Sequence, residues 1–508
     1  PSPRLAVLRT LYDPADDGIL DPGALVLYFP APHSFTGEDV LELHIHGGPA
    51  TITAVLAAVP QCAAHFECPE CKEVGAGHAI RYAEPGEFTR LAFLNKRLSL
   101  PQIEALSATL SAQTEQQRRV AARGSRSALS DTYEAWRMKL LLARGELEAI
   151  IDFHESEDFD ETPEQLAKNV AQMARGLLEE IKLHRANAVR GELLRSGISV
   201  AFLGAPNAGK SSLLNRVVGR EAAIVSREAG TTRDIVDVNV DLAGWYVKFG
   251  DMAGLRGSNS SGHATSEKDE VGEVEQEGIR RAKERALQSD VVVVILAVEL
   301  DPENGQPVLR IDPEVVATAH ECATQGRAVL VAINKTDKLD SAEDDNFGPK
   351  IIAAWRKEVQ ASLGVEEGRI FAISCRSEAE PQTSPQNQPG GTTTPDPGHI
   401  QAFLHGLTST FSSLTQPLVP NRDPANETYL SDMSIWQDSL GASERQRVLL
   451  EECMGHLEVF LAHTLQQQSF DVVVAAESLR AAADCLARVT GRGEGGDVEE
   501  VLGVVFEK

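Results

Sequence analysis

The sequence predicts a multidomain protein of the α/β plus α class, in which an α/β domain interrupts a helical domain and an α+β domain comes first. Short β-like runs between Gly and Pro turns occupy residues 1–98, and helical periodicity begins near residue 100 and returns after residue 399. The stretch between alternates strand and helix, as α/β folds do. We expect domains or parts of domains at 1–98, 99–195, 196–380 and 381–508, the last beginning with a linker.

Composition favours a globular protein of about three domains. Of the 508 residues, 42% are hydrophobic and 24% charged, and no apolar run is long enough to span a membrane. The net charge of −27 repels phosphate backbones, so a local basic patch or a partner subunit would have to bind any nucleic acid. Seven cysteines favour a reducing compartment over a disulfide scaffold. Because the chain begins at Pro1 in mid-pattern, we expect its natural N-terminus upstream.

Long amphipathic helices are predicted on both sides of the α/β domain. Two are expected at 101–153 and 162–195, and two more at 443–465 and 472–490. The Pro-, Gln- and Thr-rich stretch 377–398 cannot build a core, so we expect a loop or linker there.

The α/β domain opens on a phosphate-binding pattern. GAPNAGKS, residues 204–211, follows an apolar strand and precedes a helix. Backbone N–H groups of such a turn hold phosphate, Lys210 meets the β- and γ-phosphate oxygens, and Ser211 binds Mg²⁺. The runs 290–298, 328–334 and 369–374 are typical of buried parallel strands.

Two motifs suited to the γ-phosphate follow that loop. GTTRD, residues 230–234, offers Thr232 as a second magnesium ligand. DMAGL, residues 251–255, follows an expected strand and places Asp251 toward the magnesium and Gly254 beside the γ-phosphate.

Two later motifs indicate the base. In NKTD, Asp337 can accept two hydrogen bonds from the guanine N1–H and amino group, which adenine does not supply, while Asn334 and Lys335 steady the base. SCR, residues 374–376, can offer backbone N–H groups to the guanine carbonyl. Five elements in this order, each at a strand end, predict GTP as the ligand.

Leu255 raises a question about hydrolysis. Many GTPases place a glutamine after the glycine of this motif to orient the attacking water, and leucine cannot do so. Three functions remain open on the residues alone: a hydrolase that orients water differently, a ribosome-assembly-type RNA-associated GTPase, and a scaffold without hydrolysis. The acidic helical flanks argue against the second, and intact Lys210, Ser211, Thr232 and Asp251 argue against the third.

The motifs together resemble the tRNA-modification GTPase family MnmE (TrmE), in its mitochondrial form. The resemblance rests on PNAGKSSLLN, AAIVSREAGTTRD, DMAGLR and EVEQEGIRRA. HSFTGEDVLELHIHGGP, residues 33–49, and EPGEFTRLAFLNKRLSLPQIEAL, residues 84–106, extend it toward the N-terminus. It implies a folate-binding-like α+β domain, then a helical domain interrupted by a Ras-like P-loop GTPase domain.

The resemblance also implies a K⁺-activated mechanism. Asn207, Ser226, Glu228 and Thr231 would bind K⁺, and Glu275 of EVEQEGIRRA would orient the water in place of Leu255. Lys210, Asp251, Gly254 and Glu275 form the expected catalytic set. The expected GTP-binding residues are Asn207, Ala208, Gly209, Lys210, Ser211, Ser212, Ser226, Thr231, Thr232, Asp251, Gly254, Asn334, Lys335, Asp337, Ser374, Cys375 and Arg376.

The segment before Glu275 departs from the family pattern. Residues 256–274 are longer than expected and rich in Ser and Gly, and a longer tether makes Glu275 harder to position. Glu270 and Glu273 are therefore alternative water-orienting residues, and Glu275 could instead be one of several solvated acids opening a helix.

The resemblance further implies a 5-formyl- or 5,10-methylene-type tetrahydrofolate bound where N-terminal domains meet across a homodimer. Glu42 would suit the amidine edge of the pterin and Arg97 the glutamate tail, although each could simply be a solvated side chain. An N-terminal segment with a further arginine and a short Cys-containing C-terminal tail are expected beyond the two ends of this chain.

Partners and compartment follow from the same resemblance. It implies modification of the wobble uridine, position 34, of certain tRNAs with a carboxymethylaminomethyl- or taurinomethyl-type group, together with an FAD-dependent MnmG-type subunit. We expect tRNA to be bound mainly through that complex. The expected location is the mitochondrion, with the bacterial cytoplasm as the alternative.

One cluster lies outside the family pattern. Residues 62–71, CAAHFECPEC, place Cys62, His65, Cys68 and Cys71 at three-residue spacing, which could hold Zn²⁺. Structural zinc sites usually take ligand pairs from two separate places, so we favour an inserted loop without a metal.

Overall fold

The computed structural model describes most of the chain in two compact units. The described residues are 2–65, 80–152, 163–220, 222–227, 238–250, 280–302, 305–339, 347–376, 398–420, 433–465 and 471–492. The first unit comprises Pro1–Ser107, Gly124–Ile181 and Arg445–Lys508, and the second Ala108–Arg123 with Lys182–Glu444. Within the described residues, none of the helices combines the length and apolarity needed to traverse a bilayer. The described residues form helices, an antiparallel sheet and a mixed sheet, which confirms the predicted fold class.

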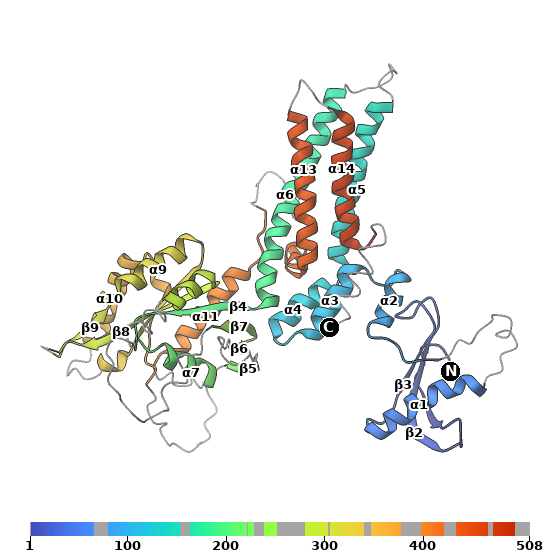
Figure 1. Ribbon diagram of the computed structural model, residues 1–508, viewed down its shortest axis with the longest axis horizontal. Coiled ribbons are helices and arrows are strands. Elements are labelled where there is room, and N and C mark those ends of the chain that lie inside the picture. The colour runs from blue at the N-terminus through green and yellow to red at the C-terminus, as the bar shows by residue number, and fades with distance from the viewer. Residues whose placement is uncertain are drawn as a thin grey trace. The chain divides into compact units, whose positions relative to one another are not determined.

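The N-terminal region is an antiparallel sheet with two helices. Its strands β1 (Val7–Tyr12), β2 (Ile19–Phe29) and β3 (Val40–His44) lie in that order. Helices α1 (Pro49–His65) and α2 (Glu87–Leu94) follow in the chain (Figure 1). Residues alternate along β2, so that Ala24 and Val26 are buried while Leu25 is exposed. This is the α+β texture expected from the sequence.

Four long helices of the first unit lie side by side in Figure 1 and enclose a single core. They are α5 (Ser127–Asp152), α6 (Pro163–Ser196, in this unit to Ile181), α13 (Glu444–Leu465) and α14 (Val472–Thr490). Tyr133, Leu147 and Phe460 are among the fully buried side chains. Asp471 caps α14 by accepting from the N–H groups of Val473 and Val474, at 2.9 and 3.3 Å.

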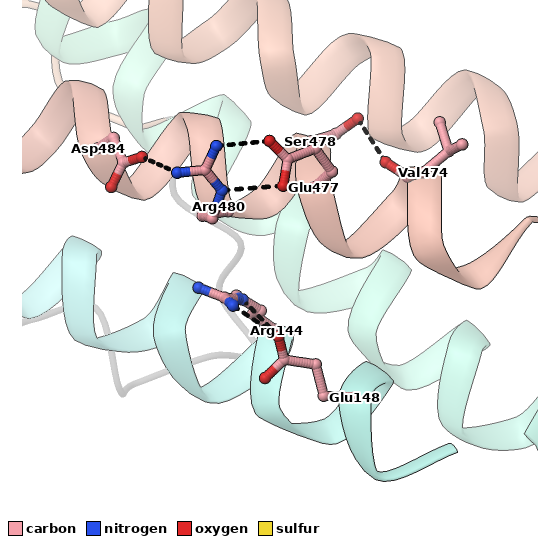
Figure 2. Close-up of polar contacts among 7 residues, drawn as sticks. All are labelled: Arg144, Glu148, Val474, Glu477, Ser478, Arg480 and Asp484. Atoms are coloured by element: carbon pink, nitrogen blue, oxygen red, sulfur yellow. Dashed lines mark hydrogen bonds and ion pairs between the residues drawn. The ribbon is translucent and has the colours of Figure 1, made fainter. Parts of the chain in front are cut away.

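The outer faces of these helices are charged. Figure 2 shows Arg480 of α14 paired with Glu477 and Asp484, and Arg144 of α5 paired with Glu148. Each pair joins neighbouring turns of one helix at the surface, where such pairs contribute little to stability. The apolar core therefore holds the helices together.

The long helix predicted at 101–153 is wrong, because this stretch forms three helices, α3 (Leu100–Ser111), α4 (Glu115–Gly124) and α5. The side chain of Gln117 accepts from the N–H groups of Gln113 and Thr114, at 2.8 and 3.1 Å, and so starts a new helix. The periodicity continues across this break, which is why it was not visible in the sequence. The helices expected at 162–195, 443–465 and 472–490 match α6, α13 and α14.

The second unit contains an eight-stranded sheet in the order β11-β10-β8-β4-β7-β6-β5, with β9 paired to β8. Strands β4, β7, β8, β10 and β11 are parallel, including the three that the apolar runs predicted. Strands β5, β6 and β9 pair antiparallel. The bounds are β4 Ile198–Leu203, β5 Ala222–Arg227, β6 Val238–Leu242, β7 Trp245–Phe249, β8 Val291–Leu300, β9 Pro307–Arg310, β10 Ala328–Asn334 and β11 Ile370–Ala372.

Helices cover both faces of this sheet. Side chains of α7 (Lys210–Arg220) and α11 (Ile400–Thr415) share one core with it, and those of α9 (Pro313–Thr324) and α10 (Phe347–Leu363) share the other. The sequence had placed residues 400–415 with the second helical part, whereas Phe403 and Phe411 of α11 are fully buried against the sheet. The unit also contains the short elements η3 (Thr336–Leu339), η4 (Glu367–Arg369), α12 (Met433–Asp438) and η6 (Ser439–Gly441).

Candidate nucleotide-binding site

The phosphate-binding pattern forms the turn between β4 and α7. Asn207 and Gly209 adopt positive φ values of 61° and 103°. A Cβ on Gly204 would collide with the carbonyl oxygen of Ile295, and one on Gly209 with the side-chain amide of Asn334. These two positions therefore require glycine, which leaves backbone N–H groups accessible at the start of a helix.

Lys210 bends back over this turn. Its Nζ donates to the carbonyl oxygens of Gly204 and Ala205, at 2.7 and 3.0 Å. Burial lowers the pKa of the Lys210 amine from its ordinary value. The ammonium group thus lies across the loop expected to receive phosphate, held by carbonyls that a phosphate can replace.

Asn334, the last residue of β10, ties the base motif to the phosphate loop. It is 1% exposed, and its Nδ2 donates to the carbonyl oxygen of Ala208 at 2.9 Å. Its Oδ1 is buried without a hydrogen-bond partner among the described residues. A buried acceptor left unpaired is costly, so this oxygen is suited to receive a donor from a ligand.

Asp337 is held by the loop that follows β11. Its Oδ1 accepts from Ser374 Oγ at 2.8 Å, and its Oδ2 lies 3.7 Å from Arg376 Nη1. Thr336 Oγ1 donates to the Ile373 carbonyl at 3.0 Å, which joins the ends of β10 and β11. Asp337 therefore keeps acceptor lone pairs for a base while its position is fixed.

The middle residue of the second base motif is Cys375. Burial raises the pKa of its thiol to about 11, so it is a neutral side chain at pH 7. Ser374 N donates to the Gly398 carbonyl at 2.9 Å, which anchors this loop to the start of α11.

The structure thus brings together two groups of predicted residues. They are Asn207, Ala208, Gly209, Lys210, Ser211 and Ser212 on the phosphate side, and Asn334, Lys335, Asp337, Ser374, Cys375 and Arg376 on the base side. The hydroxyl-bearing Ser211 and Ser212 are exposed in the first turn of α7. Ser226 lies on β5, and its side chain is not described.

The remaining residues predicted to contact the γ-phosphate, Mg²⁺, K⁺ or the attacking water lie outside the described residues, together with Leu255. They are Glu228, Thr231, Thr232, Asp251, Gly254, Leu255, Glu270, Glu273 and Glu275. Their predicted roles stay predictions.

The two predicted folate ligands are both exposed. Glu42 lies on β3 with its Oε2 3.3 Å from His44 Nε2, and its side chain is 48% exposed. Arg97 follows α2 and donates from Nε to the Ser34 carbonyl at 3.1 Å. Among the described residues no hydrogen bond or ion pair joins Glu42 to Arg97.

Sequence reasoning missed a polar pair in this region. Asp21 is completely buried and accepts from Gly23 N, from His46 N and from His46 Nδ1, at 2.8, 2.8 and 3.0 Å. The backbone N–H groups of His46 and Gly23 hold the pKa of Asp21 below its usual value. An Asp in a strand and a His before two glycines carry no periodic signal that would have joined them.

The Cys/His cluster lies partly outside the described residues. Cys62 is exposed on α1, while the side chain of His65 is not described and Cys68 and Cys71 lie outside the described residues. Elsewhere in the described chain, no group of three or more His, Cys, Asp or Glu side chains could hold a metal.

Comparison with family models covers nearly the whole chain. Residues 1–97 match the model described as GTP-binding protein TrmE N-terminus, and residues 100–508 match the MnmE helical domain model. Among solved structures, the cytosolic domain of the T. maritima FeoB iron transporter in its GMPPNP form covers 58% of this chain and is itself 98% covered. It is 14% identical, with a TM-score of 0.23, and so loose a superposition carries no argument.

Curated relatives match over the full length. The mitochondrial tRNA modification GTPase mss1 of Schizosaccharomyces pombe is 36% identical over 100% of this chain and 87% of its own. The tRNA modification GTPase MnmE of Paramagnetospirillum magneticum is 35% identical over 100% and 90%. The mitochondrial 5-taurinomethyluridine-[tRNA] synthase subunit GTPB3 of Danio rerio is 34% identical over 100% and 85%. The chain therefore belongs to the MnmE (TrmE) family of GTPases.

Proposed function

We propose that this protein is a K⁺-activated GTP hydrolase that takes part in modifying the wobble uridine of tRNA. The observation that carries the nucleotide part is the hydrogen bond from Asn334 Nδ2 to the Ala208 carbonyl, because it joins the base motif to the phosphate loop. The tRNA part is supported by the relatives that match this chain over its whole length, which are named tRNA modification GTPases or a taurinomethyluridine-[tRNA] synthase subunit.

The described residues account for binding of GTP. On binding, Lys210 exchanges its two backbone carbonyl partners for β- and γ-phosphate oxygens, and the N–H groups at the start of α7 donate to the same phosphates. Asp337 accepts from the N1–H and amino group of guanine, while Ser374 keeps the carboxylate oriented. Asn334 Oδ1 supplies a further buried acceptor.

Two cations complete the proposed mechanism. The Ser211 hydroxyl, exposed in the first turn of α7, suits Mg²⁺, which neutralises charge on the β- and γ-phosphates; Thr232 and Asp251 would complete its shell. Asn207 is exposed on the phosphate loop, with an amide oxygen suited to K⁺, and Ser226, Glu228 and Thr231 would share that ion. Gly254 would face the γ-phosphate, and Glu275 would orient the water that Leu255 cannot.

Folate, partner and compartment belong to the same proposal. The Glu42 carboxylate and the Arg97 guanidinium have the donor and acceptor chemistry that a pterin edge and a glutamate tail require, and both are exposed. A tetrahydrofolate derivative bound there would supply one carbon. We further propose a homodimer that works with an FAD-dependent MnmG-type subunit. Mitochondrial relatives of two organisms favour the mitochondrion, although a bacterial relative is equally similar.

Single-turnover hydrolysis in KCl and in NaCl tests the cation mechanism. We expect the rate in Na⁺ to fall by as much as a missing arginine finger costs, about 10³- to 10⁵-fold, and Asn207→Ala to remove the difference between the salts. Equal rates in both salts would refute K⁺ activation.

The same assay identifies the water-orienting residue. Glu275→Ala should bind GTP normally but hydrolyse it slowly, because orienting water matters in the transition state alone. Glu270→Ala and Glu273→Ala are the matched controls and should keep the parent rate. If Glu275→Ala hydrolyses GTP at the parent rate while Glu270→Ala or Glu273→Ala is slow, the longer segment 256–274 has placed that other glutamate at the water in place of Glu275.

Mass spectrometry of tRNA nucleosides from a deletion strain tests the pathway. Unmodified position 34 is expected, and full modification there would refute the tRNA part while leaving GTP hydrolysis intact.

A further inference from the structure

Helix α4 is held by the turn of a hairpin in the α/β sheet. Strands β6 and β7 are joined by Ala243 and Gly244, both with positive φ, and the Gly244 carbonyl accepts from Gln116 N at 3.1 Å. Gln116 is the second residue of α4, so its N–H has no partner within the helix. The hairpin turn therefore supplies a cap that α4 lacks.

The far side of α4 is fixed to the end of α6. Gln117 Nε2 donates to the Arg195 carbonyl at 2.8 Å, and Val120 packs with Leu194 in a small buried cluster. Trp245, the first residue of β7, packs against the same cluster. The centroid of its ring lies 5.9 Å from that of Phe411 of α11. Although α4 lies between α3 and α5 in sequence, it belongs to the compact unit that contains the sheet.

We expect this attachment to keep α4 ordered. The helix has ten residues, and helices of that length are marginal in water without tertiary contacts. Its own ion pairs, from Glu115 to Arg118 and Arg119, are exposed and join turns of the same helix, so they contribute little. Losing the cap from the hairpin would therefore loosen α4 measurably.

The hairpin also connects the two γ-phosphate motifs in the sequence. β6 begins at Val238, shortly after GTTRD, and β7 ends at Phe249, just before Asp251. β6 and β7 pair along their whole length, from Val238 with Phe249 to Leu242 with Trp245, so the ends of the hairpin and its turn belong to one hydrogen-bonded ladder. We propose that the order of α4 changes with the bound nucleotide because the β6–β7 turn transmits the change to it. Through its chain connections to α3 and α5, α4 then transmits this change to the helical domain. This inference rests on the proposed GTP binding.

Hydrogen exchange of the full chain with GDP and with GMPPNP tests the proposal. In the parent protein, exchange of the α4 peptide should differ between the two nucleotides by about two- to tenfold, the range expected for gaining or losing one hydrogen bond. Gln116→Pro removes the N–H that meets Gly244, together with the Gln116 side chain, and places a proline in the first turn, where proline is tolerated. In this variant the difference should vanish while the difference in the β6–β7 peptide remains.

Two further variants separate coupling from helix stability. Glu115→Gln removes the ion pairs within α4 but not the bond to the turn, so it should keep the nucleotide difference. Gln117→Glu keeps the acceptor for Gln113 and Thr114 and loses the donor to Arg195, so it should reduce the difference.

The outcomes distinguish this inference from the GTPase proposal. Equal α4 exchange with both nucleotides in a parent protein that binds and hydrolyses GTP would overturn the inference alone, as would an undiminished difference in Gln116→Pro. Failure to bind either nucleotide would overturn both.

Discussion

The nucleotide site and the exposed face of the N-terminal sheet differ in how their residues are held. At the nucleotide site, Asn334 and Lys210 bond to the backbone of one loop, and Ser374 holds Asp337. In the N-terminal region, the Glu42 side chain has one polar contact among the described residues, to its strand neighbour His44, and Arg97, which follows α2, donates to a loop carbonyl. The first set includes the buried bond between Asn334 and Ala208, whereas in the second the side chains of Glu42 and Arg97 are both exposed.

Topology explains the difference. The carboxyl ends of parallel strands meet at one edge, so residues that follow β4, β10 and β11 converge wherever the sheet forms. An antiparallel sheet with an exposed face imposes no such convergence, and its functional residues depend on what binds there. The nucleotide site should therefore be sensitive to single substitutions even without a partner, and the N-terminal face insensitive.

Among the substitutions that test this comparison, the largest effect is expected for Lys210→Ala. Removing the ammonium group leaves charge developing on the phosphates uncompensated, so hydrolysis should fall by at least about 10²- to 10³-fold. Single-turnover GTP hydrolysis measures it. Lys357→Ala, an exposed lysine on α10, is the matched control and should keep the parent rate. If Lys210→Ala hydrolysed GTP at the parent rate, the residues that converge at this edge of the sheet would not form the site of hydrolysis.

Asp337→Asn should weaken GTP binding by about 100-fold. The substitution turns one acceptor oxygen into a donor that faces the guanine amino group, and hydrogen bonds to charged groups are strong. Xanthosine triphosphate, which carries a carbonyl at that position, should bind the variant better than GTP does. Calorimetry with both nucleotides provides an internal control, because an unfolded variant would bind neither. Equal affinity of the parent for ATP and GTP would refute the base assignment.

The sequence predicted best the residues that follow the parallel strands. Asn334, Asp337 and the phosphate loop were predictable because strand, turn and helix signals surround each motif. The break before α4 was not, because a side-chain cap from Gln117 interrupts a periodicity that continues on both sides. The packing of α11 on the sheet was also missed, since an amphipathic helix does not reveal which core it joins.

Asp21→Asn tests the buried, hydrogen-bonded part of the N-terminal region around Asp21 and His46. Because the folded pKa of Asp21 is lowered, its contribution to stability is present above the unfolded pKa, about 3.9, and is lost as the pH falls through the folded pKa. Calorimetric unfolding should show the variant less stable than the parent at pH 7, with the difference shrinking below about pH 4. A difference that is constant with pH would mean that the charge of Asp21 is not what stabilises the loop at His46.

The smallest effect on folding is expected for Glu42→Gln. Nearly half of this side chain is exposed, and among the described residues its one polar contact is to His44, so the free energy of unfolding should change by no more than about 0.5 kcal/mol. Its effect on a ligand should be much larger if Glu42 binds the amidine edge of a pterin, because the amide offers one acceptor where the carboxylate offers two. Fluorescence titration with 5-formyl-tetrahydrofolate should then show about tenfold weaker binding.

Glu38→Gln, four residues earlier in the loop before β3, is the control and should bind like the parent. If Glu42→Gln also binds like the parent, Glu42 is a solvated side chain and the folate assignment loses its carboxylate. If it instead lowers stability strongly, the face is held by contacts beyond His44, and the contrast with the nucleotide site is wrong.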